Sequence, residues 1–277
     1  RILADNIWDY SRDDIPEAWR LIGEDPRDDV RAPQFAQLVR AFMPDVLDLQ
    51  EYSLHMHQRF YPLIRRYGYR IAYEGEEPWN NTPIFYNPET VELVDVNYVL
   101  YAPSCWSNIG SKSYTSAVFR KKDTGRLFAV VNTHLWWKSE AAQPGSTYAR
   151  AAQVRLMMAE AEVLKNKYGC TIFVTGDMNA YEDSLPIRQF IEGGYTPCYK
   201  AATDATDNGN GHHICGPKDG YSRTSRRRSP DREKGAIDHC FIYNAQEGVA
   251  VKVFDCITAR FTVKLTDHYP YLIDAAL

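Results

Sequence analysis

The sequence predicts an α/β fold in which β-sheets pack face to face and helices cover their outer faces. Two observations support this: strand-like runs outnumber helical ones, and pairs of strand runs alternate with single helices. A third is that the chain shows neither a linker-like boundary nor a strong internal repeat. Together they favour a single domain over residues 1–277.

The first half of the chain contains two predicted helices. Apolar residues repeat at helical spacing from Phe35 to Phe42, with Pro33 near the start and Pro44 as the stop. The second helix is expected over residues 55–66. The strands expected in this half cover residues 2–8, 45–51, 69–73, 83–86 and 91–99.

In the second half, residues 114–121 and 126–134 predict a hairpin, because a KDTG turn joins two strand runs. A long helix follows, with Thr147 as its expected cap and Gly169 at its end. The remaining expected elements are a strand at 171–177, a helix at 184–191, and strands at 236–244, 248–257 and 269–274. Residues 198–235, rich in Gly, Asn, Asp and Arg, are expected to be a loop.

Composition narrows the class of protein. The chain has 44% hydrophobic and 25% charged residues, which is typical of globular proteins. The net charge of −4 gives no global attraction to nucleic acid. No apolar run reaches the length of a membrane span, and we expect a monomer. Because the sequence begins at Arg1 rather than Met, we expect a longer precursor, which leaves export open.

The six cysteines match neither a CxxC motif nor a structural zinc site. Cys170, Cys240 and Cys256 lie in or beside apolar strand runs and are expected to be buried thiols. Cys198 and Cys215 flank a hydrophilic insert and could form a disulfide, although we favour two free thiols.

Polar residues with catalytic chemistry recur at the ends of predicted strands. Strand ends can converge on one rim of a sheet, so these residues are expected to form one site. For any one of them, a polar loop residue explains the position equally well; for the whole set it does not. The residues are Asn6, Glu51, His134, Asp177, Asp238 and Asp267.

Five motifs spread over the chain carry a family resemblance: QE at 50–51, NTHL at 132–135, GDMN at 176–179, AID at 236–238 and TDH at 266–268. In this order they resemble the signature blocks of the endonuclease/exonuclease/phosphatase superfamily. The resemblance implies a four-layer α/β sandwich with two mixed β-sheets at its centre. It also implies Mg²⁺-dependent, sometimes Mn²⁺-dependent, hydrolysis of a phosphate ester by direct attack of water.

A hard cation with oxygen ligands would neutralise the phosphate charge, which makes Glu51 the expected carboxylate ligand and Asn6 a supporting metal ligand through its carbonyl oxygen. Asp267 is a candidate second metal contact. By resemblance, Asp177 orients or deprotonates the attacking water, and Asn179 holds a phosphate oxygen. GDMN alone could be an Asx-rich turn, but not together with its partner motifs.

His134 is expected to donate to a phosphoryl oxygen or to protonate a leaving group. By resemblance, His268 binds phosphate or acts as a base, and Asp238 fixes its tautomer. His239 is expected to be structural and to point the other way along its strand. In the deoxyribonuclease branch a glutamate pairs with the first histidine; here Asn80 or Asn81 takes its place, which favours phosphate binding for His134.

Candidates for substrate contact lie in the loops. Trp136 and Trp137 could stack on a base, a sugar or an inositol ring, or could pack their loop against the protein. Lys138 could meet a phosphate, and Asn81 is a further candidate. Residues 223–234 hold six basic and two acidic residues, so this segment could bind nucleic acid or a phosphorylated lipid or inositol head group, or be a solvated loop.

The leading hypothesis is a metal-dependent phosphoesterase that hydrolyses a phosphodiester or a phosphomonoester. One alternative is a DNA or RNA endonuclease or exonuclease; Trp8, at a position that is acidic in several apurinic endonucleases and nucleases, argues against the abasic-site branch. The other is a catalytically silent member that binds phosphorylated ligands, which the complete set of site residues argues against.

Overall fold

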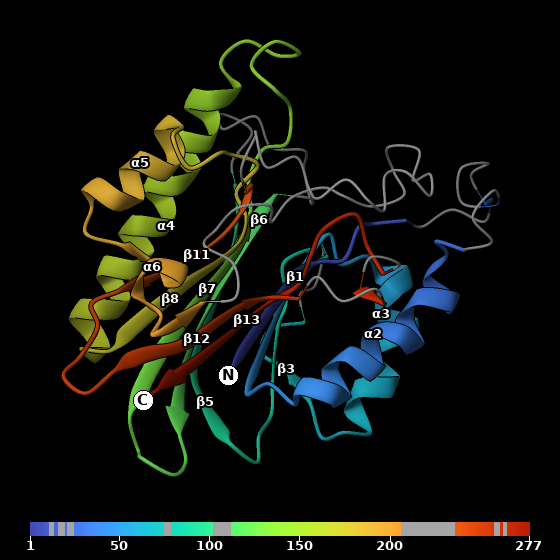
Figure 1. The fold of residues 1–277 in the computed structure, drawn as a ribbon, viewed down its shortest axis with the longest axis horizontal. Helices are drawn as coiled ribbons and strands as arrows, with labels where there is room; N and C mark the ends of the chain where they lie inside the picture. Colours follow the sequence, from blue (N-terminus) through green and yellow to red (C-terminus); the bar gives the residue numbers. More distant parts are fainter. Residues whose placement is uncertain are drawn as a thin grey trace.

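The computed structural model describes residues 1–10, 14–15, 20, 25–74, 79–101, 112–205, 236–257, 261–262 and 265–277. These residues form four layers: two mixed β-sheets lie at the centre, and helices cover both outer faces (Figure 1). The predicted α/β sandwich is confirmed.

The first sheet has seven strands among the described residues, in the order β10-β12-β13-β1-β2-β4-β3. The pairs β1/β2 and β10/β12 are parallel, and the other pairs are antiparallel. The strands are β1 (Ile2–Asn6), β2 (Val46–Gln50), β3 (Arg70–Ile71), β4 (Ile84–Tyr86), β10 (Asp204–Ala205), β12 (Ala250–Cys256) and β13 (Tyr271–Ala276).

The second sheet has six strands among the described residues, in the order β5-β6-β7-β8-β11-β9. Only β7 and β8 are parallel in it, and the predicted hairpin is confirmed as β6 and β7. The strands are β5 (Val91–Leu100), β6 (Ser113–Lys121), β7 (Leu127–His134), β8 (Thr171–Asp177), β9 (Thr196–Pro197) and β11 (Asp238–Tyr243).

Three apolar clusters separate the four layers. Helices α2 (Asp28–Phe42) and α3 (Leu54–Arg65) pack on the first sheet through residues such as Phe35 and Phe60. Helices α4 (Ser146–Tyr168) and α5 (Leu185–Glu192) pack on the second sheet through residues such as Met157 and Phe190. Between the sheets, residues such as Phe173 close the central core. Burying these faces is the main driving force for this arrangement.

Helix ends show where the sequence predictions were incomplete. Helix α2 begins at Asp28, ahead of Pro33, which lies inside it. Thr147 does not cap α4; the cap is Gly145, at φ 93°, and the Glu140 carboxylate accepts from the backbone N–H groups of Gly145 and Thr147. Carboxylates are favoured there because the start of a helix leaves N–H groups unsatisfied. Gly169 ends α4 in the left-handed region, as predicted.

Several short elements were not predicted. Strands β9 and β10 and the one-turn helix α6 (Cys198–Ala201) lie within residues 196–205, most of which was expected to be loop. Strand β3 is shorter than the predicted 69–73. These elements are too short to give a periodic signal in the sequence. Where they form is decided by their contacts with neighbouring elements.

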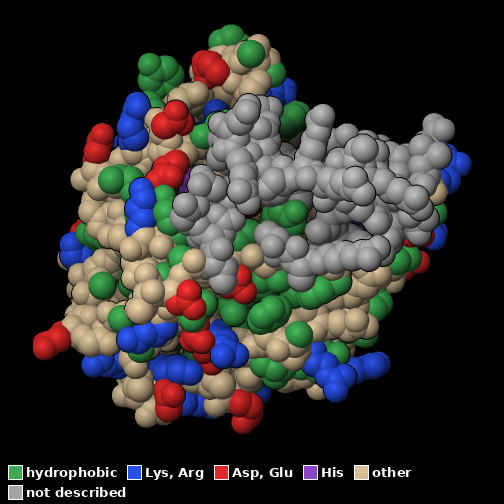
Figure 2. All heavy atoms as spheres, viewed as in Figure 1, with side chains coloured by type: hydrophobic (Ala, Val, Ile, Leu, Met, Phe, Trp, Pro, Cys, Tyr) green, Lys and Arg blue, Asp and Glu red, His purple; other side chains and the backbone are tan. Residues whose placement is uncertain are grey.

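Cys170, Cys240 and Cys256 are buried free thiols, as predicted. Cys198 is also a free thiol, whereas Cys215 lies outside the described residues. Figure 2 shows acidic and basic side chains interspersed on one face of the molecule. No helix in the described part of the chain is long and apolar enough to cross a membrane.

Candidate active site

Side chains alternate along each strand, and this alternation turns a set of polar residues toward the space between the sheets. In β7, Val130 belongs to the central core, so His134 faces the same way. In β8, Phe173 belongs to that core, so Asp177 also faces inward. The inward-facing polar residues at the ends of the two other strands are Asn6 of β1 and Asp238 of β11.

Strand register makes three of these residues neighbours. Strands β7 and β8 are parallel, and His134 pairs with Asp177 at their common end. Strands β8 and β11 are antiparallel, and Asp177 pairs with Asp238. Asp177 therefore lies between a histidine and a second carboxylate. Nε2 of His134 is 3.4 Å from its Oδ2.

Gly176 allows this close pairing of β7 and β8. It has φ 139°, in the region that favours glycine. A Cβ atom built on it would lie 2.0 Å from the carbonyl oxygen of Thr133, which is backbone and cannot move aside. Any other residue here would separate the two strands beside His134 and Asp177.

Asn6 links the rims of the two sheets. It pairs with Gln50 in the β1/β2 register, so Glu51 follows at the same rim. Its Nδ2 donates to Oε1 of Glu51 at 3.2 Å and to Oδ2 of Asp177 at 2.9 Å. Its Oδ1 accepts from the backbone N–H of Trp8. In this structure Asn6 thus supports Glu51 by donating to it, and a metal contact through its carbonyl oxygen stays a prediction.

Strained backbone concentrates at this rim. Trp8, Glu51 and Asn179 have φ of 54°, 54° and 46°, in the left-handed region that side chains other than glycine disfavour. Such residues each cost about 1–3 kcal/mol and persist where the surroundings fix them. Here the Asp9 N–H donates to Glu51 Oε2, and the Asn179 N–H donates to Asp177 Oδ1. The strained residues therefore lie where backbone N–H groups hold two carboxylates at one site.

Two groups of side chains in the described residues offer ligand atoms within 4.8 Å of one another. The first is Glu51, His134 and Asp177, and the second is Asp177, Asp238 and His268. Burial opposes ionisation of Glu51, but nearby positive charges outweigh it and lower its pKa to about 2. An ionised, partly exposed carboxylate beside a second carboxylate is a donor set that suits a hard divalent cation.

His268 is held by Asp238, as the resemblance implied. Its Nδ1 lies 2.7 Å from Oδ2 of Asp238, which leaves Nε2 facing Asp177 and Asp267 at 3.9 Å each. Burial disfavours the charged imidazole, but the three carboxylates outweigh burial and raise the pKa of His268 well above its usual value. His268 therefore presents an N–H into the site from its Nε2.

Lys112 is a site residue that the sequence analysis missed. Its buried Nζ lies 2.7 Å from Nε2 and 3.0 Å from Nδ1 of His134. Burial and the Lys112 charge lower the pKa of His134 to about 4, so this histidine is neutral at pH 7. The one available signal was hairpin register: Tyr114 pairs with Thr133, so the residues just before β6 lie beside His134.

Arg31 fixes the backbone that carries the site. It is fully buried and donates to the carbonyl oxygens of Ile7, Trp8 and Leu265. Its charge is balanced by Asp28 at 2.7 Å. The segment after β1 and the segment before Asp267 are therefore held together by one guanidinium group, which can donate in several directions at once.

Family comparison agrees with this arrangement. The model of the Endonuclease/Exonuclease/phosphatase family matches residues 20–268. The chain belongs to this family. Hydrolysis of phosphoester bonds is the chemistry of the endonuclease/exonuclease/phosphatase family. A search of curated protein sequences found no match.

Solved structures of the endonuclease/exonuclease/phosphatase family share the fold over nearly the whole chain. A family protein of Bacteroides vulgatus has 21% identity and a TM-score of 0.72, covering 100% of this chain and 98% of its own. A mannosyl-6-phosphatase of Bacteroides thetaiotaomicron has 18% identity and a TM-score of 0.74, covering 100% and 99%. The human Nocturnin catalytic domain with bound sulfate has 20% identity and a TM-score of 0.69, covering 99% and 93%.

The remaining predicted site residues lie around the two metal-capable groups described above. Asn179 follows Asp177 and donates through Nδ2 to the Leu135 carbonyl oxygen. Asp267 is buried but belongs to neither metal-capable group. His239 bonds through Nε2 to the Ala180 carbonyl oxygen, away from the cluster, as expected.

The two asparagines predicted in place of a carboxylate lie in the segment before β4, and their role at the site stays a prediction. Asn80 bonds to Tyr73, Thr82 and Thr115 through its side chain. Asn81 accepts the Tyr52 N–H on its carbonyl oxygen, next to Glu51.

The two tryptophans after β7 have different environments. Trp136 is buried, and its Nε1 donates to Ser146, so it packs the loop against α4. Trp137 is 55% exposed, with Nζ of Lys138 lying 5.6 Å from its ring centre. The basic segment 223–234 lies outside the described residues.

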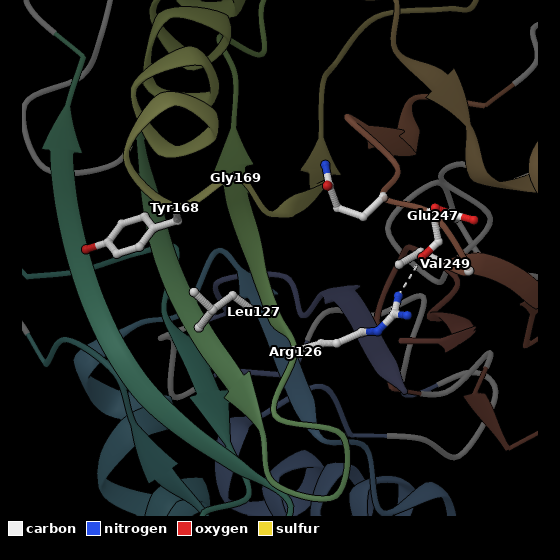
Figure 3. Close-up of a pocket in the computed structure, with 8 residues that line it drawn as sticks. Arg126, Leu127, Tyr168, Gly169, Glu247 and Val249 are labelled. Atoms are coloured by element: carbon white, nitrogen blue, oxygen red, sulfur yellow. Dashed lines mark hydrogen bonds between the residues drawn. The ribbon is translucent and has the colours of Figure 1, made fainter.

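A pocket of about 610 Å³ lies away from this site. Arg126 and Leu127 line it at the start of β7, whereas His134 ends that strand (Figure 3). On the other side of the pocket, the carbonyl oxygen of Glu247 accepts a hydrogen bond from Arg126. The pocket is therefore at the opposite end of the sheet from the candidate active site.

Proposed function

We propose that this protein is a divalent-cation-dependent phosphoesterase that hydrolyses its substrate by direct attack of water, with Mg²⁺ or Mn²⁺ as the cation. The observation that carries the proposal is the convergence of Glu51, Asp177 and two histidines at one rim of the sandwich. Such a set unites cation ligands with hydrogen-bond donors for an anionic phosphoryl group.

Glu51 and Asp177 would hold the cation. Both offer carboxylate oxygens, and Asn6 keeps them adjacent by donating to each. When bound, the cation would neutralise phosphate charge that otherwise repels an attacking water. Asp267 stays a predicted second contact, and His134 lies close enough to take part.

Asp177 would also orient the attacking water and accept its proton. Its Oδ1 is held by the Asn179 N–H, so the carboxylate cannot rotate freely. The water oxygen forms a bond to phosphorus while the phosphorus–oxygen bond to the leaving group breaks, and the leaving oxygen takes up a proton. Water that is positioned in this way needs little further ordering to react.

The phosphoryl oxygens would be bound by donors from both sides. His268 offers its Nε2–H because Asp238 occupies Nδ1. Lys112 brings a positive charge next to His134 on the opposite side. Because His134 is neutral at pH 7, we assign it a phosphate-binding role and assign proton donation to His268.

The test is hydrolysis of p-nitrophenyl phosphate and bis-p-nitrophenyl phosphate with Mg²⁺ or Mn²⁺. We expect cation-dependent turnover of one of them by the wild type, strongly reduced in His268→Ala and Asp177→Asn. Asp183→Asn is the matched control, because Asp183 is exposed in the loop after Asp177. Equal turnover in all variants would overturn the proposal. Plasmid DNA, sphingomyelin and inositol phosphates then identify the natural class of ester.

A further inference from the structure

A pair of buried thiols lies in the core between the two sheets, outside the candidate active site. The Sγ atoms of Cys198 and Cys240 are 3.1 Å apart, with Cys240 as the donor. The two residues are 0% and 4% exposed, and both are free thiols. Neither has a part in the chemistry proposed above.

The pairing of β9 with β11 brings the two cysteines close together. Strands β9 and β11 are antiparallel, with Thr196 opposite Ile242 and Pro197 opposite Phe241. Cys198 follows Pro197 directly as the first residue of α6, and Cys240 precedes Phe241 in β11. The sulfur atoms of a disulfide are about 2.0 Å apart, so the two thiols at 3.1 Å need only a small approach to bond. The folded chain therefore already holds the two thiols side by side.

We propose that Cys198 and Cys240 form a disulfide when the chain folds in the presence of a small-molecule disulfide such as oxidised glutathione. One thiolate attacks the glutathione disulfide and releases one reduced glutathione, which leaves a mixed disulfide. The second thiolate attacks the protein sulfur of that bond and releases the other glutathione. Two protein thiols are oxidised, and one glutathione disulfide is reduced to two thiols.

Burial determines when the exchange occurs. A thiol reacts as its thiolate, and burial raises the pKa of Cys240 well above its usual value. The exchange is therefore slow in the folded chain and fast while α6 and β9 are not yet docked. The finished cross-link is then shielded from reductants by the same burial.

The cross-link closes a long loop, since the two cysteines are 42 positions apart. Restricting so long a segment removes many conformations from the unfolded chain. For a chain of this size we expect a rise in Tm on the order of 5–10 °C.

The experiment folds the full-length chain from denaturant in a glutathione redox buffer, or in reducing buffer. Remaining thiols are then alkylated under denaturing conditions, and non-reduced peptides are mapped by mass spectrometry. We expect a peptide pair joining Cys198 to Cys240, lighter by two hydrogen atoms than the two free peptides. Both thiols found alkylated, or Cys198 found joined to Cys215, would overturn the proposal.

Variants separate the cross-link from general folding effects. Each protein is compared with itself, oxidised against reduced, so any loss of stability caused by the substitution cancels. Cys215→Ser is expected to keep the whole rise in Tm, whereas Cys198→Ala and Cys240→Ala lose it. An undiminished rise in both Cys198→Ala and Cys240→Ala would contradict the assignment. Turnover is not used, so the outcome is independent of the proposed activity.

Discussion

His134 and Asp177 occupy matching positions at the ends of neighbouring parallel strands, with Nε2 of His134 3.4 Å from Oδ2 of Asp177. Backbone hydrogen bonds of the sheet fix this pair. His268 lies in the segment before β13 and depends on one side-chain bond to Asp238 for its orientation. One half of the site is therefore built by strand register, and the other half by a side-chain contact.

Removal of divalent cations is expected to abolish turnover and to lower the Tm. A cation held by Glu51 and Asp177 would bind the folded state, where the two carboxylates are adjacent, and not the unfolded chain. A cation at a hundred times its Kd stabilises the folded state by about 2.7 kcal/mol. Thermal unfolding with EDTA, and then with added Mg²⁺ or Mn²⁺, measures the shift. Glu51→Gln should lose most of it; a full shift in that variant would place the cation elsewhere.

Asp238→Asn is expected to lower kcat on the order of 10²–10³-fold with a small change in KM. The amide no longer stabilises the charged His268 ring or selects its tautomer, although it keeps the shape of the carboxylate. Steady-state kinetics over a range of pH measures the effect, because loss of the carboxylate should also move the pH profile. An unchanged kcat and profile would show that His268 does not need Asp238.

Lys112→Met is expected to lower kcat/KM about 10–100-fold, because a charge that meets the phosphoryl group is lost. Lys112→Arg should recover part of the activity, since it restores the charge with different geometry. Lys122→Met is the matched control: Lys122 is exposed in the β6–β7 turn. If Lys112→Met behaves like the control, Lys112 has no role in substrate binding.

Asp48→Asn is expected to stabilise the protein at neutral and alkaline pH. Burial raises the pKa of Asp48 to about 7, although Thr175 donates to it. Between about pH 4 and 7 the folded state keeps a proton that the unfolded state has lost, so stability falls as pH rises. The total cost above pH 7 is on the order of 4 kcal/mol. Urea unfolding at pH 5 and pH 8 should show a smaller difference in the variant than in the wild type.

Arg31→Met is expected to destabilise the fold by about 3–5 kcal/mol, because it removes the guanidinium group that pairs with the buried Asp28 carboxylate. The loss also frees the backbone on both sides of the site. Arg27→Met, whose ion pair with Asp25 is partly exposed, should cost less than about 1 kcal/mol. Urea unfolding of both variants makes the comparison, and equal costs would mean that Arg31 does not hold these segments.

The sequence determined the class of the fold and predicted most residues of the candidate site. Strand alternation and the motif residues Glu51, His134, Asp177 and His268 can be read from the chain, because these signals are local. The cap of α4 was misassigned to Thr147 because Glu140, which satisfies the helix start, lies outside the helix.

Only the tertiary structure decided which of these residues meet, and which unmarked residues join them. Lys112 and Arg31 belong to no motif. Their roles follow from the groups that they contact: the His134 ring for Lys112 and backbone carbonyl oxygens for Arg31. In the sequence, Cys198 and Cys215 flank a hydrophilic insert, whereas the proximity of Cys198 to Cys240 appears only in the fold, where β9 pairs with β11. Local patterns fix the period and the ends of strands, whereas contacts between distant segments depend on how the strands order and pair, which no local pattern encodes.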